Sequence, residues 1–379
     1  MTIMAEEKKA KKQPKNEQAL AFSEMDDEMK GILFNEDDYA HLDPEDIVPS
    51  GSLSLDMALG IGGYPRGCIL DVFGPESAGK SLLSILLMAQ VQRIAREKGQ
   101  GGMIVVWDAE RSYSKNLDWM RVNGVDTSKV KFLKLKPTQG AEIGFNTLYN
   151  IISAGALDLA VIDSIPSLIP QAALDREFVQ TMMPGARAGM LTNVLPRFVG
   201  AIDDSKAIVM CINQMRANMD MNNKYAPREK ETSNWSLKHW STIRMQVNKM
   251  GKPNEENDVP VSHRVRVKII KNKVGKPYRK AEFDLNYTRG VEVAGEVADI
   301  MLSAGLITQK GAWYYLGDDK YNGLDKFVTK LRGEPALLAE YREKVLALGK
   351  DVNAFGIRDQ SAVVPDEDGG EDGLAVSAD

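Results

Sequence analysis

Residues 69–98, ILDVFGPESAGKSLLSILLMAQVQRIAREK, decide the fold of this chain. An apolar run leads into a glycine-rich loop, and a helical pattern follows. The eight loop residues match GxxxxGK[S/T], the pattern of a phosphate-binding loop between a strand and a helix. Backbone N–H groups of such a loop point at a triphosphate, the lysine reaches the terminal phosphates and the serine hydroxyl ligates Mg²⁺. The residues predicted to bind nucleotide are Gly74, Pro75, Glu76, Ser77, Ala78, Gly79, Lys80 and Ser81, with Ser81 also on the metal.

Further apolar runs, separated by helical segments, predict the rest of a sheet. The runs are residues 103–107, 159–162 and 207–212, and the helical segments include residues 82–98 and 140–154. This alternation predicts an α/β fold, with a parallel sheet covered on both faces. Two later runs, residues 264–270 and 281–285, alternate polar and apolar residues. They are typical of antiparallel strands that extend one side of the sheet.

Changes in composition predict the domain limits. Residues 1–20 are polar and of low complexity, so we expect a disordered lead-in. Residues 21–48 carry apolar residues at helical spacing and end at a break that contains prolines. The prediction is then a core over residues 49–292, a small α+β C-terminal domain over residues 293–357 and an acidic disordered tail over residues 358–379.

The overall composition excludes several protein classes. The chain has 379 residues, of which 43% are hydrophobic and 27% charged, as is ordinary for a globular protein. The longest uncharged stretch, residues 143–157, is shorter than the ~18 residues that span a bilayer. The lysine-rich N-terminus has no apolar core of a signal peptide. Cys68 and Cys211 are too few for a disulfide framework. We therefore expect a cytoplasmic protein without a membrane partner.

Charge is distributed unevenly along the chain. The net charge is −5, yet residues 206–280 contain 17 basic and 6 acidic residues. A basic segment inside an acidic protein suggests a polyanionic partner. A solvated strand face with lysines along its edge is the alternative explanation.

Polar residues that follow the predicted strands supply the remaining chemistry. Asp163 ends one apolar run and is predicted to hold the Mg²⁺ shell, while Glu110 follows another and is predicted to activate the attacking water. Gln214, after Asn213, ends a fourth run and is predicted to sense the γ-phosphate. The alternatives are a helix cap for Asp163, a surface acid for Glu110 and a capping pair for the two amides.

Two long polar stretches, residues 170–185 and 215–238, interrupt the predicted core. A long polar loop inside a compact domain is usually functional or disordered. Both contain arginines, and both follow strands whose ends should lie near the nucleotide. They are therefore predicted to follow a nucleic-acid backbone without reading its sequence, with plain linkers as the alternative.

Taken together, these residues resemble the RecA-type recombinases of bacteria and their phages. The resemblance is carried by VPSGSLSLDMALGIGGYPRG (48–67), GPESAGKS (74–81), VVWDAERS (105–112), LAVIDSIPSLIP (159–170), CINQMR (211–216), RVRVKIIKNKVGKP (264–277) and AEFDLNYTRGVEVAGEVADI (281–300). It implies a RecA-like phosphate-loop NTPase core, preceded by a small helical segment that serves oligomerisation.

The resemblance also implies an activity. Such a protein uses ATP and Mg²⁺, forms a helical filament on single-stranded DNA, pairs it with homologous double-stranded DNA and exchanges strands. Single-strand-binding and loader proteins would assist it in a bacterial or phage-infected cell. The implied catalytic residues are Lys80, Glu110 and Gln214, with Lys271 and Lys273 reaching a neighbouring subunit's ATP and Tyr287 stacking near adenine; the implied DNA contacts are Arg176, Arg187, Arg197, Arg216, Lys238, Arg244, Arg266 and Lys268.

The chain departs from the family pattern at two places. Ser114 and Leu117 stand where the family usually has an Asp and a Tyr that read the adenine. Near the end of the second loop, Trp235 leads to His239 in place of a Phe at the subunit interface. A hexameric DNA helicase and a DNA-coating relative without turnover are the alternative functions.

Overall fold

The computed structural model describes residues 43–175, 185–217, 229–231, 235–256, 258–288 and 290–350. Contacts divide the chain into a first unit, residues 1–44, and a second, residues 45–379. The predicted lead-in, most of the predicted N-terminal helical segment and the acidic tail lie outside the described residues. The domain limits given above therefore remain predictions.

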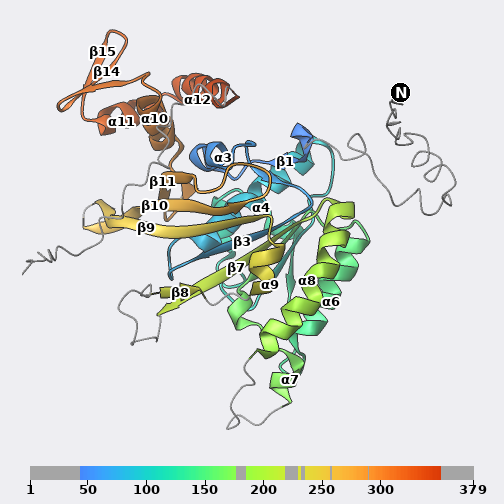
Figure 1. Ribbon diagram of the computed structural model, residues 1–379. Helices are drawn as coiled ribbons and strands as arrows, with labels where there is room; N and C mark the ends of the chain where they lie inside the picture. The colour runs from blue at the N-terminus through green and yellow to red at the C-terminus, as the bar shows by residue number, and fades with distance from the viewer. Residues whose placement is uncertain are drawn as a thin grey trace, which may run out of the picture. The chain divides into compact units, whose positions relative to one another are not determined.

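A ten-stranded sheet organises the second unit (Figure 1). Strands β3, β7, β6, β4 and β5 run parallel, and β9 joins β3 in parallel before β10, β11 and β12 continue antiparallel. This mostly parallel sheet with an antiparallel extension confirms the predicted fold class. In spatial order the strands are β12 (Gly290–Val291), β11 (Lys280–Asn286), β10 (Val259–Asn272), β9 (Ile243–Glu256), β3 (Cys68–Gly74), β7 (Ile208–Ala217), β6 (Leu159–Asp163), β4 (Ile104–Asp108) and β5 (Val130–Leu133), with β8 (Glu229–Glu231) paired to β7.

Four strands of this sheet were not expected from the sequence: β5, β8, β9 and β12. In β9, buried Ile243, Met245 and Val247 alternate with polar residues, but its second half is polar and hides the pattern. β9 matters because it links the parallel and antiparallel parts of the sheet. β5 is only four residues long and only its first residue is buried, so it lacks an apolar run.

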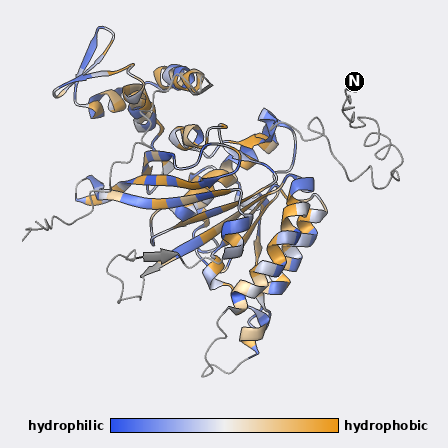
Figure 2. Ribbon diagram, in the orientation of Figure 1, coloured by the Kyte–Doolittle hydropathy of each residue, from blue (hydrophilic) through white to orange (hydrophobic). Residues whose placement is uncertain are grey.

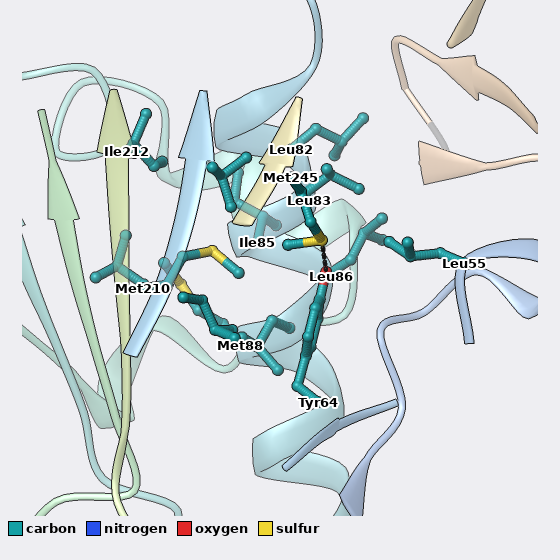
Figure 3. Close-up of a cluster of buried hydrophobic side chains, with 14 of the residues drawn as sticks. Leu55, Tyr64, Leu82, Leu83, Ile85, Leu86, Met88, Met210, Ile212 and Met245 are labelled. Carbon is teal, nitrogen blue, oxygen red and sulfur yellow. Dashed lines mark hydrogen bonds between the residues drawn. The ribbon is translucent and has the colours of Figure 1, made fainter. Parts of the chain in front are cut away.

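Helices cover the two faces of the sheet. On one face, α3 (Leu53–Leu59) and α4 (Lys80–Glu97) pack on a hydrophobic cluster that includes Leu83, Met88 and Met245 (Figure 3). On the other, α6 (Ala141–Ser153) and α8 (Ala186–Ser205) lie side by side (Figure 1) over a second cluster that includes Trp107 and Phe145. Figure 2 shows hydrophobic residues along the strands and along both of these helices. The prediction of a sheet covered on both faces is confirmed.

Short elements complete this part of the unit. Strands β1 (Ile47–Val48) and β2 (Tyr64–Pro65) form a separate antiparallel pair beside α4. The remaining short segments are α5 (Leu117–Val122), α7 (Gln171–Leu174), α9 (Trp235–Trp240) and the 3-10 turns Pro44–Asp46, Thr127–Lys129 and Ile165–Ser167. None of the helices in the described ranges is long and apolar enough to cross a membrane.

A third hydrophobic cluster forms the centre of the C-terminal segment. Helices α10 (Val293–Ser303), α11 (Leu324–Gly333) and α12 (Pro335–Lys350) pack around Val297, Phe327 and Leu331, next to the small sheet β13 (Thr308–Lys310), β14 (Trp313–Leu316) and β15 (Asp319–Asn322). Leu53 of α3 joins this cluster. The carboxylate of Glu296 on α10 accepts hydrogen bonds from the Ser52 hydroxyl at 2.5 Å and from the Leu53 and Ser54 N–H groups. A buried acid of the C-terminal segment thus caps the first turn of α3.

Candidate nucleotide-binding site

The phosphate loop joins the end of β3 to the start of α4, as the sequence predicted. A Cβ on Gly74 would lie 2.1 Å from the Val247 carbonyl oxygen, so only glycine allows β9 to approach this closely. Gly79 precedes α4 with a φ of 104°, and a Cβ there would lie 2.5 Å from a methyl group of Leu285. The loop therefore packs directly on β9 and β11, and its backbone is fixed by residues far away in the sequence.

Lys80 lies across this loop. Its ammonium donates to the carbonyl oxygens of Gly74 at 3.0 Å and Pro75 at 2.5 Å. Burial lowers the pKa of Lys80, while the carboxylates of Asp163 and Glu110 act in the opposite direction. The loop's own carbonyls thus hold the cation where a bound phosphate would meet it.

Ser81 and Asp163 come together beside the loop. The Ser81 hydroxyl donates to Oδ2 of Asp163 at 2.9 Å, and Asp163 lies at the end of β6 with 3% exposure. Burial raises the pKa of Asp163 to about 6, against the hydrogen bond from Ser81. Both side chains offer oxygen atoms, the ligands that Mg²⁺ prefers, so these residues fit a magnesium ion.

The sequence interpretation missed Tyr113, which lies behind this pair. Its side chain is 2% exposed, and its hydroxyl lies 2.7 Å from the Ser84 hydroxyl of α4. Burial and the nearby Asp163 carboxylate raise its pKa, so the phenol remains protonated. A tyrosine in a loop after a strand carries no signal in one sequence, because only the fold brings it against α4.

Glu110 and Gln214 meet close to Asp163, whose carbonyl accepts from the Glu110 N–H at 3.3 Å. The Gln214 amide donates to Oε1 of Glu110 at 2.6 Å, and the hydroxyls of Ser164 and Ser167 donate to the same oxygen. One correction concerns β7, which continues to Ala217 and does not end at Gln214. Gln214 is placed by its register opposite Gly74, at the start of the phosphate loop. The Glu110 carboxylate, which can accept a proton, is thus hydrogen-bonded to the Gln214 amide beside the phosphate loop.

Arg244 has a position that the predicted DNA contact did not anticipate. It is 7% exposed, and its Nε donates to Oδ2 of Asp71 at 2.8 Å beneath the ring of Phe73. Asn213 donates to the other oxygen of Asp71 at 2.7 Å. Removing one partner of a buried ion pair strongly destabilises a protein, so this contact gives Arg244 a structural role, and its implied DNA contact stays a prediction. Asn213 likewise belongs to this internal network.

The other implied DNA contacts are spread over several elements. Arg187 of α8 donates to the Leu168 carbonyl at 3.0 Å, Arg266 of β10 pairs with Glu282 at 2.6 Å, and the Lys238 ammonium of α9 lies 6.0 Å from the centre of the Trp235 ring. Arg197 of α8 lines a hollow of α6 and α8, and Lys268 of β10 lies opposite Lys280 of β11. Arg176 and the Arg216 side chain lie outside the described residues. Their contacts with DNA remain predictions.

Lys271 and Lys273 lie away from the phosphate loop of their own chain. The Lys271 ammonium donates to the carbonyls of Lys238 at 2.8 Å and His239 at 2.7 Å, at the end of α9. In the sheet, Lys271 is level with Arg244 and Asp71, three residues before β3 ends. The Lys273 N–H donates to the Thr242 carbonyl, which places this residue at the same end of β10.

Tyr287 follows β11 on the side of the phosphate loop. Its side chain is 38% exposed, its N–H donates to the Val261 carbonyl and its carbonyl accepts from the Trp119 indole at 2.9 Å. Two backbone contacts thus fix the position of this residue.

Comparisons with known proteins agree with this geometry. The family model described as the RecA N-terminal domain matches residues 20–292. The chain is 36% identical to the "Protein RecA" of Nocardioides sp. over 308 residues, 80% of this chain and 83% of that protein. It is 32% identical to the "Protein RecA" of Levilactobacillus brevis over 334 residues, 88% of this chain and 83% of the relative. Identity to the "Protein RecA" of Acidothermus cellulolyticus is 34% over 86% of this chain and 91% of the relative.

Proposed function

The chain belongs to the RecA family, and from this premise we propose that it is a DNA-dependent ATPase and recombinase. In this proposal it forms a helical filament on single-stranded DNA, pairs that strand with homologous double-stranded DNA and exchanges strands. The observation that carries the proposal is the pair of contacts beside the phosphate loop, Ser81 with Asp163 and Glu110 with Gln214. A phosphate loop alone binds nucleotide, but the second contact adds groups that can act on water and respond to the γ-phosphate.

The proposed roles follow from these contacts. Lys80 leaves its loop carbonyls to pair with the β- and γ-phosphates, and the loop N–H groups bind the same anion. Ser81 and Asp163 would hold Mg²⁺, which neutralises charge that develops on the phosphate oxygens. Glu110 accepts a proton from the attacking water, after Gln214 has released it.

The Glu110–Gln214 hydrogen bond also suggests how nucleotide state reaches DNA. The γ-phosphate is an acceptor that competes with Glu110 for the Gln214 amide. Gln214 lies in β7, which leads directly into residues 218–228 of the predicted second DNA loop. A shift of this amide therefore changes the start of that loop, a small movement of the kind that phosphate sensors use.

Residues of a second subunit would complete the site. Lys271 and Lys273 lie too far along β10 to serve their own phosphate loop, so we assign them to the nucleotide of a neighbouring copy in the filament. Accessory proteins that bind single strands or load the filament belong to the same proposal.

Strand exchange between circular single-stranded DNA and homologous linear duplex DNA, with ATP and Mg²⁺, tests the function. Joint molecules should form with the wild-type chain and not with Lys80→Ala. Absence of joint molecules despite DNA-stimulated ATP hydrolysis would favour a helicase, which electron micrographs would show as closed rings rather than open filaments. Filaments without any hydrolysis would favour a DNA-coating protein.

A further inference from the structure

His263 is a buried polar residue that the proposed function leaves unexplained. It lies on β10 with 5% exposure, on the same face as Val265 and Val267, which pack in the α4 cluster. Neither ring nitrogen of His263 has a hydrogen-bond partner among the described residues. Buried polar groups are nearly always hydrogen-bonded, and an unpaired one destabilises the protein. A residue that keeps this disadvantage calls for a functional explanation.

His263 lies between Tyr287, the residue predicted to stack on adenine, and the phosphate loop. Its ring faces the Tyr287 ring at 5.4 Å between centroids and an angle of 31°. The backbone of Ala78, in the phosphate loop, lies close enough to favour the protonated ring, although it does not form a hydrogen bond of ordinary geometry. Leu285, the register partner of His263, lies against the adjacent Gly79.

The imidazole has the right chemistry for such a position. Burial lowers the pKa of His263, and the nearby Lys249 ammonium lowers it further, so the ring is neutral at pH 7. A neutral imidazole offers one N–H donor and one acceptor nitrogen. It can therefore donate to a carbonyl such as that of Ala78.

Ser114 and Leu117 stand at the family's adenine-reading positions, and their side chains offer a base few hydrogen-bonding groups. The Ser114 hydroxyl donates to Oδ2 of Asp108 at 2.8 Å, and its N–H donates to the same oxygen. Leu117 has no polar group. Tyr287 therefore becomes the main surface for the base, and the orientation of its ring depends on His263.

We propose that His263 is a positioning residue of the nucleotide site. Its imidazole donates to the Ala78 carbonyl when the phosphate loop holds a triphosphate, and it holds the Tyr287 ring as the stacking surface for the purine. This inference rests on the proposed function, because it takes the nucleotide to be ATP.

His263→Phe provides the test, because phenylalanine keeps a ring against Tyr287 and removes both nitrogens. We expect a higher melting temperature without nucleotide, since two unpaired buried atoms are gone. By calorimetric titration of the full chain with ATP and Mg²⁺, without DNA, we expect binding weaker by about 5- to 10-fold, the value of one hydrogen bond. The kcat at saturating ATP and DNA should change less than KM.

Rescue separates the hydrogen bond from simple packing. His263→Asn and His263→Gln each carry an amide N–H near the position of one ring nitrogen, so one of them should recover most of the ATP affinity. A phenylalanine variant that melts higher yet binds ATP as wild type would show that His263 only fills space. The proposal would also be overturned if neither His263→Asn nor His263→Gln recovered the ATP affinity. If the phenylalanine variant does not fold, His263→Leu compared with the two amides answers the same question.

Two controls keep this inference distinct from the proposed function. Tyr321→Phe also removes a polar atom from a ring, in the small C-terminal sheet on β15, and it should leave ATP affinity unchanged. Lys80→Ala should lose ATP binding in the same titration. Wild-type binding by Lys80→Ala would refute the nucleotide site itself, whereas lost binding in Lys80→Ala together with unchanged binding in His263→Phe would refute only the role of His263.

Discussion

Replacing Glu296 by glutamine should change how the stability of the protein depends on pH. Glu296 is 1% exposed, and it accepts hydrogen bonds from Ser52, Leu53 and Ser54 at the start of α3. Burial nevertheless raises its pKa from 4.5 to about 7. The folded protein therefore binds this proton more tightly than the unfolded chain does, and the stabilisation is complete below pH 4.5 and is lost as pH rises through 7.

The magnitude follows from this difference in pKa. At about 1.36 kcal/mol per pKa unit, ionisation of Glu296 reduces the free energy of unfolding by ~3 kcal/mol between pH 4.5 and pH 7. Glu296→Gln imitates the protonated acid and cannot ionise. The variant should match wild type near pH 4.5 and exceed its stability by up to ~3 kcal/mol at pH 8. Asp56, whose pKa burial raises to about 8, titrates in the same direction in both proteins, and only the part of that rise that comes from the Glu296 charge disappears in the variant.

Urea denaturation followed by circular dichroism, at pH values from 4.5 to 8, measures the two free energies of unfolding. Glu340→Gln is the matched control, because Glu340 pairs with Lys344 on the exposed side of α12 and such surface pairs contribute little. A variant-minus-wild-type difference that stays constant across the pH range would refute the reasoning. So would a variant less stable than wild type at pH 8, since the three hydrogen bonds would then outweigh burial.

Three further predictions concern the nucleotide site. Lys80→Ala should abolish ATP hydrolysis, because it removes the charge that stabilises the transferred phosphate, and a DNA-stimulated phosphate-release assay with wild-type rates would contradict this. Glu110→Gln should keep ATP binding and filament assembly but slow hydrolysis by ~10²-fold or more, since only the base is lost; equal losses of binding and hydrolysis would make Glu110 structural. Lys271→Ala mixed with Lys80→Ala should recover part of the activity, because mixed filaments contain interfaces with both lysines intact. Co-assembled mixtures without any recovery would exclude catalysis across the interface.

The sequence predicted the parts of the fold that rest on local pattern. Buried parallel strands such as β4 and β6 are apolar runs that end in an acid, so they were visible without the structure. β9 was missed because its buried residues stop at Val247 while the strand continues as a polar ribbon to Glu256. Pairing with β10, and not local propensity, keeps this half extended.

In the candidate site, too, the sequence revealed what local pattern shows and missed what long-range contacts decide. Lys80, Ser81, Asp163 and Glu110 were found because each stands beside a strand whose end the sequence reveals. The polar residues that stand behind this set were not found, because a single sequence carries no signal for which distant side chains the fold brings against it. Tyr113 behind Asp163 is one case. Arg244 is the opposite case, since a cation in a basic segment suggests DNA, while the buried Asp71 that pairs with it lies 173 residues away.

These long-range contacts bear on how the nucleotide site would communicate with DNA. Asp71 lies in β3, three residues before the phosphate loop, and joins Asn213 of β7 to Arg244 of β9. Asn213 is next to Gln214, the proposed γ-phosphate sensor. Arg244 is level with Lys271, which is assigned to the nucleotide of a neighbouring copy. The network is buried, so removal of any one member leaves polar groups unpaired. It therefore fixes β3, β7 and β9 as one rigid body. With these strands held together, we expect a shift of the Gln214 amide to be transmitted along β7 toward Ala217, its last residue.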